Sequence, residues 1–248
     1  MIRLLLVLSL TFALVTPSLA EMAHVATASN FNQPLQLLAK SFEEKSGHNI
    51  RISSASTGKL YAQIKHGAPY HLFLAADQKR PKRLEQEGLA VPGSRFTYAA
   101  GQLTLWAPQQ SFKGEAKALI SQTDLRRFSI ANPKTAPYGA AAYQTLKAMG
   151  LWEELQGRLV RGENIAQTLQ FIASRAAEMG FVAYSQLTKE AKSTGYHWVV
   201  PQELHDPIRQ DAVLLKRGAD NPAAKAFHAF LQSDSAKALI ASLGYGNH

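Results

Sequence analysis

Short apolar or β-branched runs alternate along the chain with segments whose apolar residues recur at helical spacing. In the first third, this alternation predicts strands at residues 24–28, 49–53 and 71–75. Each strand is followed by a predicted helix, and a glycine stands where each of these helices should end. Strands and helices in this order predict parallel layers of sheet and helix.

The pattern changes at residues 94–107, which are typical of a long strand interrupted by Ala99-Ala100-Gly101. A second series of strands and helices follows, with predicted strands at 128–131, 159–160 and 181–184 and predicted helices at 138–149 and 165–178.

Residues 208–215 are typical of another long strand, and two helices rich in Ala, Phe and Leu fill residues 222–243. The two long strands predict two crossings between lobes, so the terminal helices should return to the first lobe. We therefore predict an α/β fold of two lobes joined by two crossing segments, with the ligand cleft at the carboxyl ends of the strands. The predicted boundaries are 21–99 plus 209–248 for lobe I and 100–208 for lobe II.

The first twenty residues have the three parts of a secretory signal peptide. Arg3 gives the positive start, Leu4 to Val15 the apolar stretch, and Ser18-Leu19-Ala20 the small-residue cleavage site. A mature chain beginning at Glu21 is expected to be exported to the periplasm. No later run approaches the roughly 20 apolar residues of a membrane span. The absence of cysteine excludes disulfides and thiolate chemistry.

The composition favours anionic partners, because 27 Lys and Arg face 18 Asp and Glu, for a formal net charge of +9. The densest basic run, Lys79-Arg80-Pro81-Lys82-Arg83, contains no aromatic residue and lies beside acidic side chains. It is typical of a solvated helix face, and we do not expect a nucleic-acid partner.

Four turns between a predicted strand and a predicted helix point to an oxyanion site. The two in the first lobe are Ala28-Ser29-Asn30-Phe31 and the segment 53–58. In the second lobe, residues 132–139 and Glu163-Asn164-Ile165 repeat the arrangement. The first N–H groups of a helix have no acceptor within it and lie at the positive end of its dipole, so they bind anions.

Other chemistries find little support in the sequence. The run Ser56-Thr57-Gly58-Lys59 lacks the remaining positions of a phosphate-binding P-loop, and the eight histidines are scattered without metal-ligand spacing. No pair of residues suits general acid and base roles. A secreted hydrolase of phosphate or sulfate esters would need a nucleophile or metal that the motifs do not supply. Iron bound by Tyr138, Tyr143 and Tyr184 stays open, although core packing is the expected role of Tyr143.

Several motifs together resemble the ModA family, the periplasmic molybdate-binding proteins of molybdate ABC transporters. The resemblance covers essentially the whole mature chain. It is carried by residues 26–31, 56–64, 67–69 and 72–77, by Asn132-Pro133 and Pro137-Tyr138-Gly139, by Gly180-Phe181-Val182 and by Gly244-Tyr245. It implies a type II periplasmic binding protein, a bound molybdate or tungstate dianion, and delivery to a membrane permease. It implies a non-enzymatic protein without a cofactor or metal cation, and we expect a monomer. A receptor for another oxyanion such as sulfate is the alternative.

The resemblance also implies which residues bind the anion. The hydroxyl groups fall on Ser29 and Thr57, and the backbone amides on Asn30, Tyr138 and Ile165. Many members carry a ligand-contacting tyrosine directly after the strand that contains Gly180-Phe181-Val182, whereas this chain has alanine there and Tyr184 one residue later. Because such a shift turns a strand side chain to the other face, we do not expect Tyr184 to be a direct ligand. Tyr138 or Asn30 would then supply the missing donor.

Overall fold

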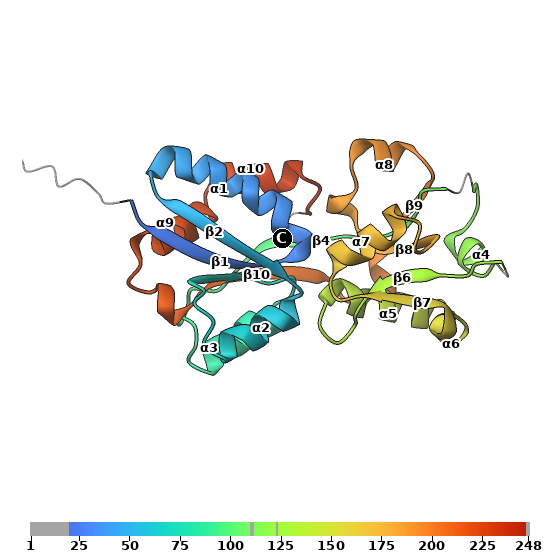
Figure 1. The fold of residues 1–248 in the computed structure, drawn as a ribbon, viewed down its shortest axis with the longest axis horizontal. Coiled ribbons are helices and arrows are strands. Elements are labelled where there is room, and N and C mark those ends of the chain that lie inside the picture. Colours follow the sequence, from blue (N-terminus) through green and yellow to red (C-terminus); the bar gives the residue numbers. More distant parts are fainter. Residues whose placement is uncertain (1–19, 110–111, 123, 247–248) are drawn as a thin grey trace, which may run out of the picture.

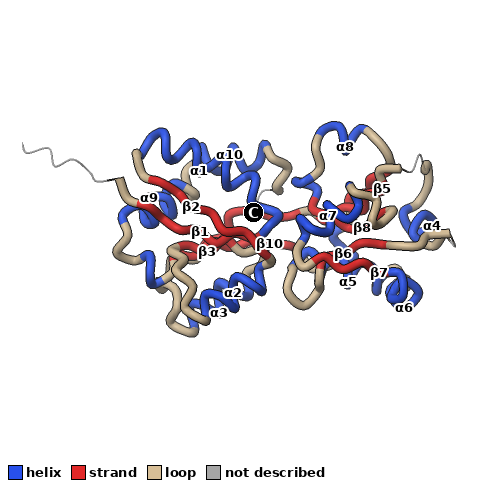
Figure 2. Tube along the Cα trace, in the orientation of Figure 1, coloured by secondary structure: helices blue, strands red, loops and turns tan. Residues whose placement is uncertain are grey.

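The computed structural model describes residues 20–109, 112–122 and 124–246. The predicted signal peptide, except its last residue, lies outside the described residues. Two five-stranded sheets lie side by side, each covered by helices on both faces (Figures 1 and 2). Within the described part of the chain, no helix is both long enough and apolar enough to cross a bilayer.

Lobe I is built on the first sheet, whose strand order is β2-β1-β3-β10-β4. Its strands are β1 (Met22–Ala28), β2 (Asn49–Ala55), β3 (Leu72–Leu74), β4 (Phe96–Gly101) and β10 (Ile208–Leu214). Its helices are η1 (Ser29–Phe31), α1 (Asn32–Ser46), α2 (Thr57–Lys65), α3 (Lys79–Gln86), η5 (Lys216–Gly218), α9 (Pro222–Phe230) and α10 (Asp234–Ser242).

Lobe II is built on the second sheet, whose strand order is β7-β6-β8-β5-β9. Its strands are β5 (Leu103–Ala107), β6 (Phe128–Ala131), β7 (Leu159–Gly162), β8 (Met179–Ala183) and β9 (Tyr196–Val199). Its helices are α4 (Ala116–Ile120), α5 (Pro137–Ala148), α6 (Trp152–Leu155), η2 (Gln156–Arg158), α7 (Ile165–Ala173), η3 (Tyr184–Gln186), α8 (Lys189–Ser193) and η4 (Gln202–Leu204).

The predicted α/β fold is confirmed, with one difference in strand direction. Each sheet holds one strand that is antiparallel to both neighbours, β10 in lobe I and β5 in lobe II. These two strands follow the crossings between the lobes, so they enter their sheets from the opposite side. Both sheets are therefore mixed, with parallel pairs among the other strands.

The two crossings appear where the sequence predicted them. The long strand predicted at 94–107 is two strands, because β4 pairs with β10 in lobe I and β5 pairs with β8 and β9 in lobe II. Only Gln102 lies between β4 and β5. After the second crossing, α9 packs against β1 and β10, and α10 against α1, so the end of the chain returns to lobe I.

Several helix boundaries differ from those that the sequence pattern predicted. α7 ends at Ala173 instead of continuing to residue 178, and Arg175 just beyond it has a positive φ of 63°. The short helices α4, α6 and α8 were not predicted, because four or five residues are too few to show a helical period. The basic run predicted as a solvated helix face is in α3, which buries Pro81 and Leu84.

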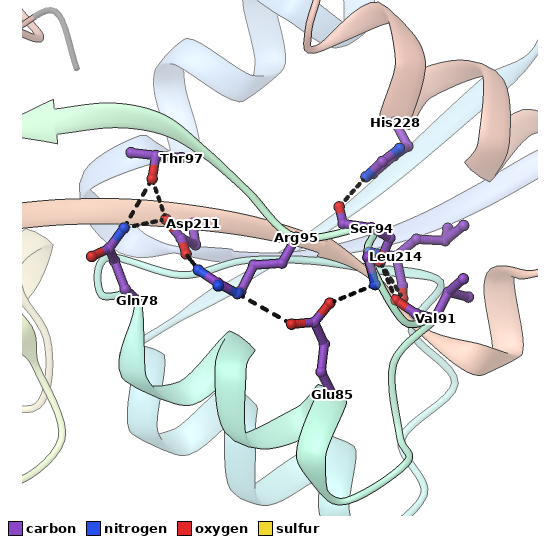
Figure 3. A network of polar contacts seen from close by, with 10 residues as sticks. Gln78, Glu85, Val91, Ser94, Arg95, Thr97, Asp211, Leu214 and His228 are labelled. Carbon is purple, nitrogen blue, oxygen red and sulfur yellow. Dashed lines mark hydrogen bonds and ion pairs between the residues drawn. The ribbon is translucent and has the colours of Figure 1, made fainter.

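A network of polar side chains ties β10 to the turn after β3 (Figure 3). Asp211 is fully buried on β10 and forms an ion pair with Arg95. Its carboxylate also accepts hydrogen bonds from Thr97 Oγ1 at 2.7 Å and Gln78 Nε2 at 3.1 Å. Arg95 reaches Glu85 of α3 as well, at 3.2 Å. The network therefore holds β4, α3 and the β3–α3 turn against β10, the strand that follows the second crossing.

Three histidines of lobe I are held in surroundings that favour their neutral form. Burial lowers the pKa of His24, His71 and His228 below the usual 6.5, and Arg51 lowers that of His24 further. His228 Nε2 lies 2.7 Å from the carbonyl oxygen of Ser94, and this contact raises the pKa of His228 and so opposes part of the effect of burial.

We expect the free energy of unfolding to fall between pH 7.5 and pH 5.5. In this window the unfolded chain binds protons that the folded chain excludes, so the histidine contribution is present above pH 6.5 and is lost as the pH falls. Urea titrations at both pH values measure the difference. His228→Gln should reduce it, whereas His66→Gln, at an exposed position, should leave it unchanged. An undiminished difference in His228→Gln would show that His228 does not contribute.

Candidate functional site

A small cavity lies between the lobes at the carboxyl ends of the strands. Its eleven lining residues come from five turns, each between a strand and a helix: Ala28, Ser29, Asn30, Ser56, Thr57, Ala76, Ala136, Pro137, Tyr138, Asn164 and Ile165. The cavity leaves about 10 Å³ for the centre of a water-sized sphere. By this measure the cavity holds about one water molecule, and an extended organic substrate does not fit it.

All five sequence-predicted site residues line this cavity. Ser29, Asn30 and Thr57 come from lobe I, and Tyr138 and Ile165 come from lobe II. The backbone amides of Asn30, Thr57, Tyr138 and Ile165 lie in the first turn of a helix, where they have no acceptor within that helix. Helix starts from both lobes thus converge on the same space.

The ends of these helices are not closed by their own side chains. η1, α2 and α5 have no side chain that caps them, although Ser56 stands at the capping position of α2. The start of α7 differs, because Asn164 Oδ1 accepts hydrogen bonds from the amides of Ala166 and Gln167, both at 3.0 Å. That cap leaves the amide of Ile165 for the cavity, as the sequence predicted.

The two hydroxyl groups of the site are oriented by backbone amides. Thr57 Oγ1 accepts a hydrogen bond from the Ala76 amide at 3.1 Å. Ser29 Oγ accepts a longer one, 3.4 Å, from the Ala166 amide of the opposite lobe. Because an amide occupies one acceptor position of each oxygen, the hydroxyl proton is left to donate to a guest.

No charged side chain lines the cavity. It therefore offers amide and hydroxyl dipoles, which is the donor set that a fully deprotonated oxyanion requires. Across the part of the chain that the structure describes, no three His, Asp or Glu side chains gather as a metal ion would need. None of the described residues that line the cavity is His, Asp or Glu.

The lobes touch each other around the cavity. The Gly58 amide at the start of α2 donates a 2.8 Å hydrogen bond to the Thr135 carbonyl of lobe II. Arg80 Nη2 donates to the Lys134 carbonyl at 3.1 Å. Lys59 and Glu163 form an ion pair at 3.4 Å that also crosses the cleft. The structure is therefore a closed arrangement of the two lobes.

The side chains of Asn30 and Tyr138 are both hydrogen-bonded to Gln210 of β10. Asn30 Nδ2 donates to Gln210 Oε1 at 2.8 Å and to the Tyr245 hydroxyl at 3.2 Å, so both of its protons are used. The Tyr138 hydroxyl accepts from Gln210 Nε2 at 3.3 Å and lies against Gly101. Burial raises the pKa of Tyr138 well above 10, so the phenol stays neutral. Asn30 therefore has only its backbone amide for a guest, whereas the Tyr138 hydroxyl, which accepts from Gln210, still has its own proton to donate.

The other two tyrosines considered for iron do not join Tyr138. Tyr143 packs edge-on against Trp152, with ring centroids 4.6 Å apart. Tyr184 lies in η3, and its ring carries the Lys192 amino group at 3.9 Å from the ring centre. Tyr138 lines the small cavity, whereas Tyr143 lines a separate pocket. Tyr184 is not among the residues that line the anion cavity.

Sequence reasoning missed two residues that shape the site. Ala76 lies in the turn after β3 at the cavity wall, and its amide orients Thr57. Gln210 is fully buried on β10 and connects Asn30 of lobe I to Tyr138 of lobe II. The position of Ala76 after a predicted strand was a usable signal, but nothing local marks Gln210.

Comparison with known proteins agrees with this geometry. The family model of the bacterial extracellular solute-binding proteins matches residues 23–246. A molybdate-binding protein ModA of Azotobacter vinelandii is 48% identical over 92% of this chain and 90% of its own length, and one of Rhodobacter capsulatus is 44% identical over 96% and 93%. The chain belongs to the ModA family of bacterial extracellular solute-binding proteins. The resemblance inferred from the motifs is confirmed.

The fold of this ModA family member is also shared with a solved relative. The periplasmic molybdate-binding protein of Azotobacter vinelandii superposes with a TM-score of 0.86 at 40% sequence identity, covering 91% of this chain and 99% of that chain. The predicted type II periplasmic binding protein fold is confirmed. Members of the family bind solutes outside the cytoplasm, so the chain belongs to an extracytoplasmic class of binding proteins.

Proposed function

We propose that this protein captures molybdate or tungstate in the periplasm and delivers it to the membrane permease of an ABC transporter. The observation that carries the proposal is the neutral cavity at which four helix starts from two lobes converge. Ser29 and Thr57 act through their hydroxyl groups, and Asn30, Tyr138 and Ile165 through backbone amides. The named functions of the close relatives support the same ligand.

Selectivity follows from the kind and spacing of the donors. A guest that keeps a proton, such as hydrogen phosphate, brings a donor to a cavity that offers donors, so one of its groups is left unpaired. Sulfate has the charge and shape of molybdate but is smaller. The proposed site therefore excludes phosphate by its proton and sulfate by its size.

The proposal includes a hinged monomer that is not an enzyme. Lobe I (21–99 plus 209–248) and lobe II (100–208) open around the two crossings, and the anion enters while they are apart. Closure then adds the lobe II amides and the contacts of Gly58 and Arg80 across the cleft. The signal peptide at 1–20 would direct the chain to the periplasm.

A thermal unfolding panel tests the ligand. At about one hundred times its dissociation constant, a ligand adds roughly 2.7 kcal/mol to the free energy of unfolding. For a chain of this size we expect the melting temperature to rise by about 5–10 °C with sodium molybdate or tungstate. Sulfate and phosphate at the same concentration should raise it by less than about 1 °C.

Equal shifts with all four anions would contradict the proposal, and a shift with sulfate alone would favour the sulfate receptor. Isothermal titration calorimetry with the same four salts gives the stoichiometry, which should be one anion per chain. Size-exclusion chromatography with light scattering checks the monomer, with and without molybdate.

A further inference from the structure

An open groove of about 500 Å³ adjoins the anion cavity. The two share Ala76, Ala136 and Pro137 as a common wall. The groove is bordered by the β3–α3 turn and the start of α3 in lobe I, by α5 in lobe II, and by residues 206–209 at the second crossing. α3 and α5 lie on the same side of the two sheets (Figure 1).

The charges along this groove are predominantly positive. Four cations, Lys79, Arg80, Lys134 and Arg209, line it with two anions, Asp77 and Asp206.

Arg80 forms an ion pair with Asp77, whose Oδ1 also accepts the Arg80 amide at 2.9 Å. The other three cations are exposed, and no ion pair among the described residues involves them. The groove therefore presents free positive charge directly outside a cavity that has none.

A second groove, of about 280 Å³, adjoins the cavity through Ser29 and Asn164. Its one charged lining residue is Glu163, which is paired with Lys59 across the cleft. The two approaches to the cavity thus differ in sign. An approaching dianion is attracted along the first groove and not along the second.

We propose that Lys79, Lys134 and Arg209, the exposed cations on both sides of the cleft, attract divalent oxyanions to the cleft while the lobes are apart and so raise the rate at which they reach the inner cavity. The proposal rests on the proposed function. Helix-end dipoles act over about one helical turn, whereas a full charge acts over a Debye length of about 8–10 Å. The neutral cavity cannot attract an ion from solution by itself, so the basic groove supplies the attraction and the cavity supplies the selection.

Stopped-flow fluorescence of the mature protein with sodium molybdate tests the proposal. The groove variant carries Lys79→Gln, Lys134→Gln and Arg209→Gln, which keep the backbone contacts of these positions. A matched control carries Lys40→Gln, Lys117→Gln and Lys225→Gln, three exposed lysines of α1, α4 and α9 that do not border the groove. Both variants lose three positive charges.

At an ionic strength of about 10 mM, we expect the association rate constant of the groove variant to fall by about three- to tenfold. At about 500 mM salt the loss should shrink below about twofold, because the charges are screened. The dissociation rate constant should not change. The control variant should lose less than about twofold at either salt concentration.

Three outcomes would overturn the proposal. An equal slowing of both variants would show that net charge alone sets the rate. An unchanged association rate in the groove variant would show that the groove does not capture the anion, and a faster dissociation would place the three cations in the bound state instead. Calorimetry on the wild-type protein separates this failure from the failure of the proposed function. A wild-type chain that binds neither molybdate nor tungstate would contradict both the proposed function and the proposed role of the groove.

Discussion

Gly139→Ala is expected to weaken molybdate binding by about 10- to 150-fold and to destabilise the fold by about 1–3 kcal/mol. Gly139 is in the first turn of α5, directly after Tyr138, and is packed against the end of β6. A Cβ at this position would lie 2.7 Å from the Ala131 carbonyl carbon and 2.8 Å from that of Asn132, both of them backbone atoms that cannot swing aside. The start of α5 must move, and the Tyr138 amide moves with it.

The expected loss corresponds to one hydrogen bond to a charged group, about 1.5–3 kcal/mol. Calorimetry with sodium molybdate measures the binding, and urea unfolding measures the stability. Gly157→Ala is the matched control, because a Cβ at Gly157 would meet no atom within 4 Å. A destabilised Gly139→Ala protein that binds molybdate as tightly as the wild type would show that the start of α5 is not part of the site.

The local sequence was sufficient to predict those features that depend on the residues of one turn alone. The role of Asn164 could be predicted, because an asparagine before a helix accepts hydrogen bonds from the second and third amides of that helix and leaves the first amide without a bond to the cap. Ser29 and Thr57 were identifiable because each follows a recognisable strand and starts a helix. The carboxyl ends of neighbouring parallel strands meet at one edge of a sheet, so these turns had to lie near one another.

Features that depend on pairing across the chain could not be predicted. Gln210 is 180 residues from Asn30 and 72 from Tyr138, and its role exists only when the second crossing brings β10 between them. Strand direction is equally non-local, because the sequence of β5 or β10 does not encode on which side of a neighbour it enters the sheet. Gly101 shows the same limit, because it leaves room for the phenol of Tyr138, which lies 37 residues further along the chain.

The proposed separation of charge from the cavity would let a basic protein select among dianions. A lysine inside the cavity would attract sulfate, phosphate and molybdate alike, and would have to lose its own hydration to do so. Cations at Lys79, Lys134 and Arg209 remain solvated and act over a distance. The discrimination is then left to oriented amides and hydroxyls, whose number and spacing depend on closure of the lobes.

Asp211→Ala is expected to reduce the free energy of unfolding by about 2–4 kcal/mol. The carboxylate of Asp211 has no solvent exposure, whereas the Arg95 side chain is 31% exposed, so the cost lies somewhat below that of breaking a fully buried pair. Removing the carboxylate leaves Arg95 without that partner and takes away the acceptor of Thr97 and Gln78 (Figure 3).

Urea unfolding at pH 7.5 measures this cost, and Asp234→Ala provides the comparison. Asp234 is fully exposed and forms a 3.9 Å ion pair with Lys237 on the same helix, so its removal should change stability by less than about 1 kcal/mol. Molybdate binding should also weaken in Asp211→Ala. Gln78 loses its hydrogen bond to Asp211 and lies in the same turn as Ala76, whose amide orients Thr57. A variant that loses stability but keeps its molybdate affinity would show that the network supports lobe I without positioning the site.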